Sequence, residues 1–236
     1  MQVFVFHTPE LVPKGTPDCA VAVDVLRATT TIATALARGA EAVEVFADLE
    51  TLNERSTAWP AECLLRAGER GGKQVEGFDL GNSPLDCTPE RVAGKRIFMS
   101  TTNGTRALQR IQHSPVVLTA AFVNLGIVAK FIASQHFETV WVVGSGWQGS
   151  FSLEDAACAG ALVDRLGGAG NDEAFAAAAL YETWKDDLVE LLEQASHGQR
   201  LLKLGCLTDL VFCASLDTVA ALPRQTEPGV LVQALG

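Results

Sequence analysis

Three stretches of the sequence place polar residues directly after a short apolar run and before a helical pattern. They span residues 21–32, 97–108 and 140–152, and their polar parts hold threonine, serine, asparagine, glycine and arginine. If the apolar runs are strands of a parallel sheet, the polar loops lie at its carboxyl edge, where open α/β proteins bind ligands. Because the N–H groups and the dipole at a helix start attract anions, the pattern predicts an anion-binding site. For one loop alone, an ordinary helix cap explains the hydroxyl residues equally well.

A fourth segment, residues 68–84, is rich in glycine and charged residues and follows neither a helical nor a strand periodicity. A loop of this length in a compact domain is functional or disordered, and its phenylalanine and Asn-Ser-Pro turn favour a function. The four segments supply the residues that we expect to contact an anionic substrate. They are Thr29, Thr30, Arg70, Asn82, Ser83, Thr102, Asn103, Gly104, Thr105, Arg106, Ser145 and Gly146.

Acidic residues accompany these loops, although a carboxylate repels an anion. They are Asp24, Glu69, Glu154 and Asp155. A magnesium ion that bridges carboxylates and anion makes the combination sensible, because Mg²⁺ prefers oxygen ligands and neutralises phosphate charge. We therefore predict that the four carboxylates approach one another as metal ligands, although Asp155 also suits the role of a helix cap.

Hydrolysis of a phosphate ester needs charge neutralisation, an activated nucleophile and protonation of the leaving group. We expect Asp24, Arg27 and Glu69 to carry this chemistry, with Asp24 acting as nucleophile, general base or metal ligand. Arg27 and Arg106 each stand beside a helix start. We expect both to bind the same anion, because a guanidinium group donates paired, charge-assisted hydrogen bonds to phosphate.

The composition narrows the class of partner. A net charge of −10 argues against nucleic acid, which attracts a basic face. No apolar run approaches the roughly 20 residues that span a bilayer, and residues 1–7 resemble a strand more than a signal peptide, so we expect a cytoplasmic protein. The six cysteines include no C-x-x-C pair and the four histidines no H-x-x-x-H pair, which argues against a zinc site.

The apolar periodicity predicts a single α/β domain over residues 1–236. We expect three α/β/α layers, a mostly parallel sheet and a helical C-terminal segment at 171–205. The expected strands are 2–6, 21–25, 42–46, 63–67, 97–99, 116–119, 139–143 and 230–232. The expected helices before the C-terminal segment are 30–38, 49–58, 106–111, 125–134 and 152–166. We interpret the charged residues between 182 and 193 as a solvated helical face.

Four of these motifs together resemble one known family, the 2-phosphosulfolactate phosphatases. They are the runs 24–31, 68–84, 101–105 and 144–160, which occur in this order within a resemblance that covers residues 2 to about 166. The resemblance implies a magnesium-dependent phosphatase of coenzyme M synthesis, which converts 2-phosphosulfolactate to sulfolactate and phosphate. That substrate carries carboxylate, sulfonate and phosphate groups, in agreement with three polar loops. We expect a small anionic phosphate ester as the partner, no nucleic acid and no membrane, and a homodimer is compatible with the sequence.

Two other classes of protein stay open. Gly144, Gly146 and Gly149 fit G-x-G-x-x-G after a strand, which is typical of a Rossmann-like nucleotide-binding oxidoreductase. However, no strand with an acidic end follows at the spacing that such a site uses. A non-catalytic anion-binding protein is the third class, and it predicts binding of phosphate esters without turnover. No phosphate-binding G-x-x-x-x-G-K-[ST] motif is present.

Overall fold

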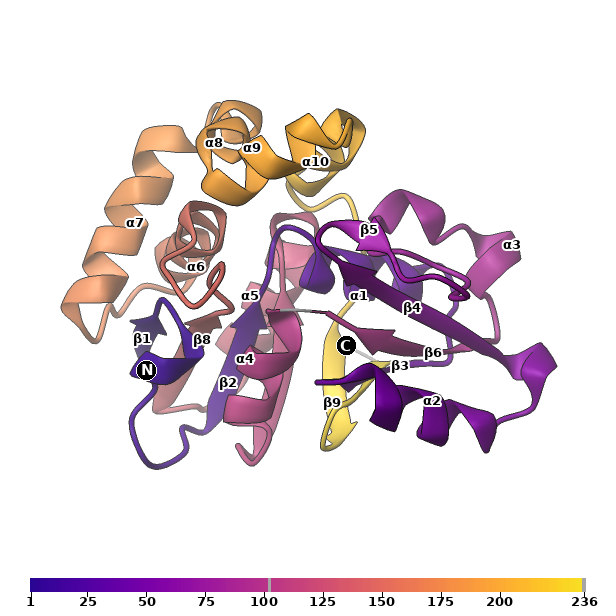
Figure 1. Cartoon of the computed structure of the whole chain (residues 1–236). Coiled ribbons are helices and arrows are strands. Elements are labelled where there is room, and N and C mark those ends of the chain that lie inside the picture. The colour runs from indigo at the N-terminus through magenta and orange to yellow at the C-terminus, as the bar shows by residue number, and fades with distance from the viewer. Residues whose placement is uncertain (102, 235–236) are drawn as a thin grey trace.

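The computed structural model describes residues 1–101 and 103–234 as an α/β protein with one large, mostly parallel sheet (Figure 1). The strands are β1 (Gln2–Phe6), β2 (Cys19–Val23), β3 (Ala42–Phe46), β4 (Leu64–Arg70), β5 (Lys73–Gln74), β6 (Arg96–Ser100), β7 (Val116–Ala120), β8 (Thr139–Gly144), β9 (Pro223–Glu227) and β10 (Val230–Gln233). The helices are α1 (Ala28–Ala37), α2 (Leu49–Thr57), α3 (Pro89–Val92), α4 (Gly104–Ile111), α5 (Leu125–Ser134), α6 (Leu153–Leu166), α7 (Asp172–Trp184), α8 (Leu188–Gln194), α9 (Ser196–Lys203) and α10 (Leu207–Cys213).

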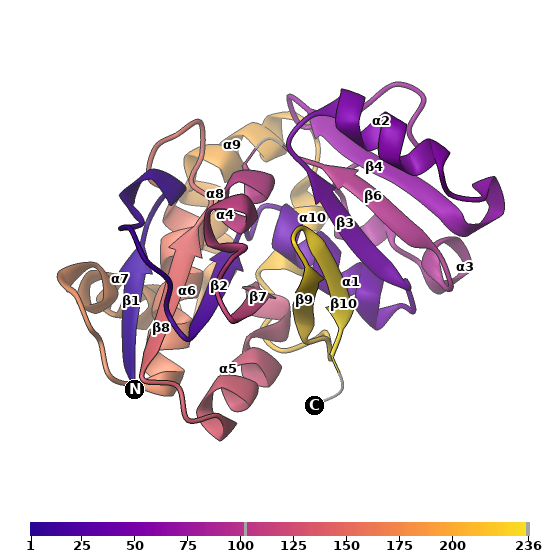
Figure 2. The same ribbon diagram turned by 90° about the horizontal axis from the view of Figure 1, so that it is seen from below.

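The sheet consists of two parallel groups, β1-β8-β2-β7 and β3-β6-β4, which the antiparallel hairpin β9–β10 joins. Figure 2 shows this hairpin between β7 and β3. Val23 pairs with Gly144 and Gly68 pairs with Ser100, so in each group neighbouring strands end side by side. The loops that follow these strands therefore start as adjacent pairs.

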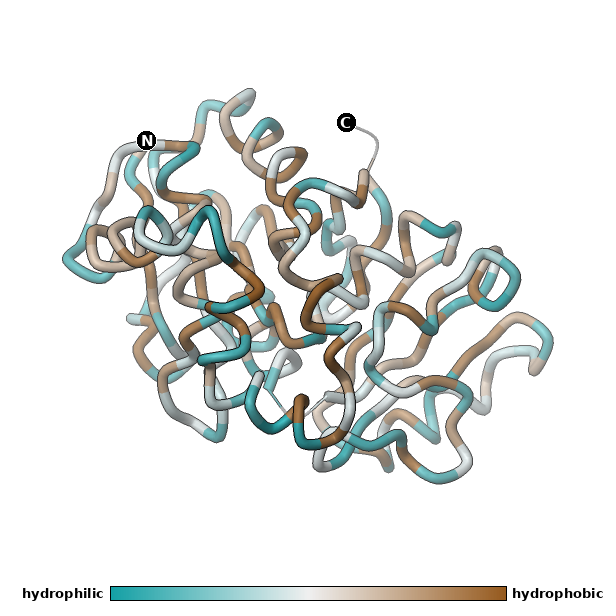
Figure 3. The backbone as a smooth tube through the Cα atoms, turned by 90° about the horizontal axis from the view of Figure 1, so that it is seen from above, coloured by the Kyte–Doolittle hydropathy of each residue, from teal (hydrophilic) through white to brown (hydrophobic). Residues whose placement is uncertain are grey.

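Strand β2 packs on both faces, because its five small or β-branched residues are all buried. Cys19, Val21 and Val23 face one core with α5 to α10, while Ala20 and Ala22 face a second core with α1 and α4. Figure 3 shows hydrophobic residues in the central strands and helices, and hydrophilic residues in the outer loops. The expected three layers and the expected mostly parallel sheet are confirmed.

Several elements differ from the sequence-based expectation. Strand β2 ends at Val23 instead of residue 25, because the chain turns at Asp24, whose side chain accepts the Ala28 N–H. The segment 68–84 is not wholly irregular, since β4 extends to Arg70 and pairs with β5. The polar strand β9 carries little apolar periodicity and was not expected. The C-terminal segment is helical as predicted and continues past residue 205 into α10.

In the part of the chain that the structure describes, no helix combines the length and the apolar character that crossing a membrane requires.

Candidate active site

Asp24 lies at the carboxyl end of β2 and is 6% exposed. Its Oδ1 accepts a hydrogen bond from the Ala28 N–H, the first residue of α1, at 3.2 Å. Burial, together with the negative charges of Glu154 and Glu69, raises the pKa of Asp24 from 3.8 to about 7. A carboxylate in this position is costly when ionised, so a nearby cation would stabilise it.

The N-terminus of α4 comes close to the N-terminus of α1 at Gly104. A Cβ atom at Gly104 would lie 2.7 Å from Ala28 Cβ and 2.9 Å from Asp24 Oδ2. Only glycine permits this approach without a shift of the backbone. Two helix starts therefore face Asp24, one from each parallel group, and their N–H groups and dipoles favour a bound anion.

Arg27 is buried beside Asp24 and forms an ion pair with Asp209 of α10. The other carboxylate oxygen of Asp209, Oδ1, accepts a hydrogen bond from the Ser83 hydroxyl at 2.7 Å. The Asp209 side chain thus connects the β2–α1 loop, the turn at Ser83 and the C-terminal helices. A planar guanidinium held in this way has its orientation set before any ligand binds.

A narrow cleft lies between these groups. It is lined by Asp24, Leu26, Arg27, Glu69, Gly72, Asn82, Thr101, Asn103 and His197. Its volume of ≈ 10 Å³ is about that of one water-sized probe, so it suits a single water or a small cation. The cleft collects residues from both parallel groups and from α9.

The cleft has the donors that a hard cation prefers. Asp24 and Glu69 line it, and the buried Oδ1 of Asn82 has no hydrogen-bond partner in the structure. Carboxylate and amide oxygens are typical ligands of Mg²⁺. In the described ranges, no three histidine, cysteine, aspartate or glutamate side chains are already arranged as a metal cluster. The donor chemistry of these residues fits Mg²⁺.

Glu154 and Asp155 begin α6 beside this cleft, and both side chains are buried. Asp155 accepts the Val25 N–H at 2.9 Å with Oδ1 and the Gly146 N–H at 3.2 Å with Oδ2. Because both of its oxygens bind main-chain amides, Asp155 fixes the β2 and β8 loops to each other. Both oxygens of Asp155 are therefore engaged by main-chain amides, and its role as a metal ligand stays a prediction. Burial raises the pKa of both Glu154 and Asp155.

His197 of α9 is a member of the site that the sequence analysis missed. It stacks on Trp147 with ring centroids 5.7 Å apart, and its Nδ1 lies 3.8 Å from Glu154 Oε1. Burial, together with the positive charge of Arg27, lowers the pKa of His197 to about 4. The ring is therefore neutral at neutral pH.

The threonines that the sequence assigns to substrate binding shape the loops, and their contact with a substrate stays a prediction. Thr29 Oγ1 lies 2.8 Å from the Ala120 carbonyl, Thr30 donates to the Val25 carbonyl at 2.8 Å, and Thr105 donates to the Phe46 carbonyl at 3.2 Å. These hydroxyls hold the helix starts against the strand ends. Thr102, also expected to contact the substrate, lies outside the described residues.

The other residues that we expected to contact the substrate lie in different places: some line the cleft, one is buried elsewhere and two lie at the surface. Asn82 and Asn103 line the cleft, and the Ser145 hydroxyl is buried without a hydrogen-bond partner in the structure. Arg70 is exposed and donates to the Ser100 hydroxyl at 3.1 Å. Arg106 forms an ion pair with Glu10, and both side chains are about half exposed. The structure thus does not place Arg106 in the cleft that Arg27 lines, and the expected arginine pair on one anion has no support in this geometry.

Asp209 and His197 escaped the sequence analysis because neither belongs to one of the polar segments that follow the expected strands. Asp209 interrupts the apolar segment Leu207–Cys213, which is the one local signal of a buried carboxylate. No comparable signal marks His197, since its contacts with Trp147 and Glu154 come from the packing of α9 against α6 and the β8 loop.

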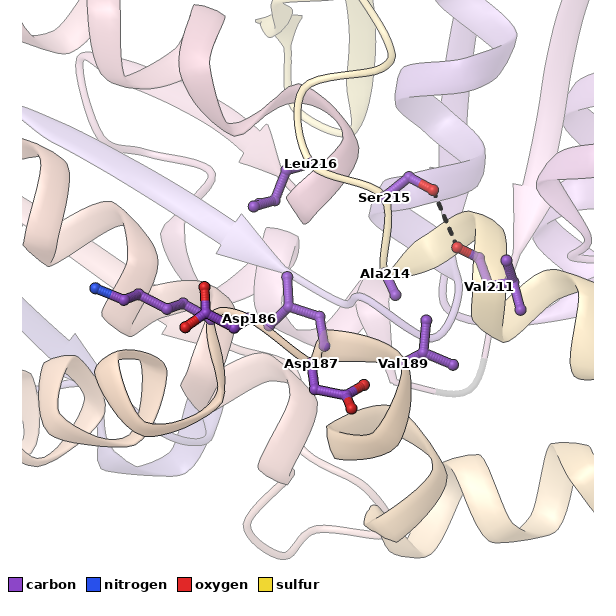
Figure 4. Close-up of a pocket in the computed structure, with 9 residues that line it drawn as sticks. Asp186, Asp187, Val189, Val211, Ala214, Ser215 and Leu216 are labelled. Carbon is purple, nitrogen blue, oxygen red and sulfur yellow. Dashed lines mark hydrogen bonds between the residues drawn. The ribbon is translucent and has the colours of Figure 1, made fainter.

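A wider hollow lies between the C-terminal helices, away from the cleft (Figure 4). Asp186 and Asp187 contribute carboxylates there, and Ser215 donates to the Val211 carbonyl at 3.0 Å. Asp187 also caps α8 by accepting the Glu190 N–H. Exposed carboxylates repel an anion, so this hollow is a poorer candidate for a phosphate ester than the cleft at Asp24.

Fold and cleft define an α/β protein with buried carboxylates at the strand ends, beside two helix N-termini and a buried arginine. A family model described as 2-phosphosulpholactate phosphatase matches residues 6–228, and the chain belongs to this family. A protein of Gloeobacter violaceus named probable 2-phosphosulfolactate phosphatase is 76% identical over 100% of both chains. A protein of the same name from Synechococcus sp. is 64% identical over 98% of both chains, and one from Microcystis aeruginosa is 57% identical over 99% of this chain and 100% of its own.

Proposed function

We propose that this protein is a magnesium-dependent phosphatase that hydrolyses 2-phosphosulfolactate to sulfolactate and inorganic phosphate. The observation that carries the proposal is the meeting of Asp24, Arg27 and the starts of α1 and α4 in one cleft. The identity of the substrate in this proposal is taken from the names of the relatives. The same groups suit the phosphate half of any such ester, because they combine positive dipoles, a guanidinium and carboxylates.

The side chains of the cleft divide the chemistry between them. In this proposal the cleft, which has room for about one water in this structure, widens to admit the phosphate. Arg27 and the N–H groups at the start of α4 then bind the phosphate oxygens and neutralise their charge. Asp24, Glu69 and the Asn82 amide oxygen would hold Mg²⁺, with Glu154 close by across His197. When bound, the cation supplies Lewis-acid stabilisation of the phosphate charge.

Proton transfer is assigned to the buried carboxyl of Glu154. Its pKa is raised, chiefly by burial, so it retains its proton to a higher pH than an exposed glutamate. A proton held there is available to the oxygen of the leaving sulfolactate. His197 lies next to this carboxyl, with Nδ1 3.8 Å from Glu154 Oε1, and it also lines the cleft at Arg27.

Removal of the divalent cation tests the proposal. We expect phosphate release from 2-phosphosulfolactate to fall at least about 100-fold with a chelator, because a metal ion supplies several kcal/mol of stabilisation. Excess Mg²⁺ should restore it. The measurement is inorganic phosphate released over time, with a broad panel of phosphate esters run in parallel.

Four results would contradict different parts of the proposal. Turnover that survives the chelator removes the metal, and turnover of other esters alone removes the substrate. Binding of esters without turnover of any of them would establish a non-catalytic anion-binding protein. Quenching of tryptophan fluorescence by a nicotinamide cofactor, without phosphate release, would instead favour the oxidoreductase alternative.

A further inference from the structure

A second hollow continues outward from the cleft at Asp24. Its volume is ≈ 160 Å³, and it is lined by Glu69, Gly71, Gly72, Asn103, Trp147, Gln148, His197 and Arg200. Glu69, Gly72, Asn103 and His197 also line the inner cleft, so the two spaces are continuous. A ligand bound at Asp24 would extend into this outer hollow.

Arg200 gives the outer hollow its positive charge. Among the described residues that line the hollow, it is the only lysine or arginine. Its Nη2 donates to the Gly71 carbonyl at 2.9 Å. That acceptor is neutral, so the contact orients the guanidinium without cancelling its charge. Glu69 also lines the hollow. Its Oε2 accepts a hydrogen bond from the Gly72 N–H at 2.7 Å, in the turn between β4 and β5.

The glycine turn between β4 and β5 allows the hydrogen bond from Arg200 to the Gly71 carbonyl. Gly71 and Gly72 have φ values of +66° and +80°, which residues with side chains rarely adopt. A Cβ at Gly72 would also lie 2.5 Å from Leu204 Cδ1. The turn therefore packs tightly against α9 and holds Arg200 at the rim of the hollow.

The opposite wall is aromatic and uncharged. Trp147 and His197 stack nearly parallel, with 17° between their planes. Trp147 belongs to the β8–α6 loop and His197 to α9. His197 also lines the inner cleft, so this wall continues from the cleft into the outer hollow. A wall of this kind excludes water from one side of a ligand and strengthens its interaction with Arg200.

The other arginines near the site do not serve a second anionic group, because Arg27 is assigned to the phosphate and Arg106 lies outside the cleft. Arg27 pairs with Asp209 inside the cleft, and Arg106 pairs with Glu10 at the surface. A substrate with several negative groups on a chain of net charge −10 needs a further cation beyond the phosphate site. Arg200 is placed to supply it.

We propose that the outer hollow binds the second anionic group of the substrate, a sulfonate, and that Arg200 selects for it. This inference rests on the proposed function. In 2-phosphosulfolactate the carboxylate and the phosphate oxygen are attached to the same carbon, whereas the sulfonate is attached to the next carbon of the chain. The group furthest from the ester bond therefore enters the hollow furthest from Asp24.

The test compares two esters that differ only in the sulfonate: 2-phosphosulfolactate and 2-phospholactate. For Arg200→Gln, we expect KM for 2-phosphosulfolactate to rise about 10- to 100-fold, the worth of a charged hydrogen bond, with kcat changed less than about 3-fold. KM for 2-phospholactate should change less than about 3-fold. Arg200→Lys should recover part of the loss. Lys203→Gln, an exposed position on the same helix, is the matched control and should match the wild type.

An equal rise in KM for both esters, or no rise for either, would overturn the assignment. Calorimetry with sulfolactate and lactate decides the question even if neither ester is hydrolysed. The wild type should bind sulfolactate more tightly, and Arg200→Gln should lose the difference. A wild type that binds both acids equally would refute the sulfonate site, whereas the absence of turnover alone refutes the proposed function.

Discussion

Replacement of Asp24 by asparagine is expected to lower kcat for phosphate release by about 10²- to 10⁴-fold, the usual contribution of a catalytic carboxylate. Asparagine keeps the oxygen that accepts the Ala28 N–H, so the turn into α1 should persist. It loses the negative charge that would hold Mg²⁺ or act on the ester. Steady-state phosphate release with saturating Mg²⁺ measures the effect.

The same substitution should change how stability depends on pH. The pKa of Asp24 is about 7 in the folded chain and near 3.8 when exposed, so the folded state binds its proton more tightly. Between pH 3.8 and pH 7, the free energy of unfolding therefore falls as pH rises, by at most about 1.4 kcal/mol for each pH unit. Glu154 and Asp155 shift in the same direction. Without divalent cations, Asp24→Asn should therefore melt at a higher temperature than the wild type above pH 7.

Asp48→Asn is the matched control, because Asp48 is an exposed cap of α2 that asparagine replaces well. It should keep full activity and the wild-type pH dependence. Added Mg²⁺ should raise the melting temperature of the wild type at pH 8 more than that of Asp24→Asn. Full turnover by Asp24→Asn would contradict the assignment of Asp24 to the reaction.

The second large effect is expected for Arg27→Lys, which should lower kcat/KM by about 10- to 1000-fold. A lysine keeps the charge but loses the paired hydrogen bonds, each charged bond being worth about 1.5–3 kcal/mol. The buried ion pair with Asp209 means that stability also changes. Removal of one partner alone, as in Asp209→Asn, should cost about 3–5 kcal/mol, because it leaves Arg27 buried and unpaired.

A double variant separates activity from stability. In Arg27→Met with Asp209→Leu, both charges are replaced by apolar groups, which typically costs little stability. We expect a melting temperature near that of the wild type together with a loss of activity at least as large as for Arg27→Lys. Arg106→Lys is the matched control at the surface, and its kcat/KM should stay within about 2-fold of wild type. Wild-type activity in the double variant would remove Arg27 from the site.

The convergence of Asp24 and Glu69 was predictable from the sequence, since both lie at the carboxyl ends of strands, where polar loops begin. The outward direction of Arg106 was also within reach of sequence reasoning. Ala107, Leu108 and Ile111 form the buried face of α4, and a helix turns 100° per residue, which leaves Arg106 outside that face. The structure adds the reason for Gly104, which lets two helix starts approach the same carboxylate.

The contribution of the C-terminal helices could not be predicted in the same way. Asp209 reaches Arg27, and His197 reaches Glu154, across separations of 182 and 43 residues. Local periodicity reports which face of a helix is apolar, but not which strand end the helix covers. Strand β9 escaped for a related reason, because its polar residues are stabilised by pairing with β10 and not by an apolar face.

The most direct test of the location of the site is a crystal structure of the protein soaked with Mg²⁺, inorganic phosphate and sulfolactate. We predict that phosphate binds within hydrogen-bond distance of Arg27 and the start of α4, with the cation on Asp24. Phosphate bound beside Arg106, or in the hollow between α8 and α10 in Figure 4, with nothing at Asp24, would contradict the assignment.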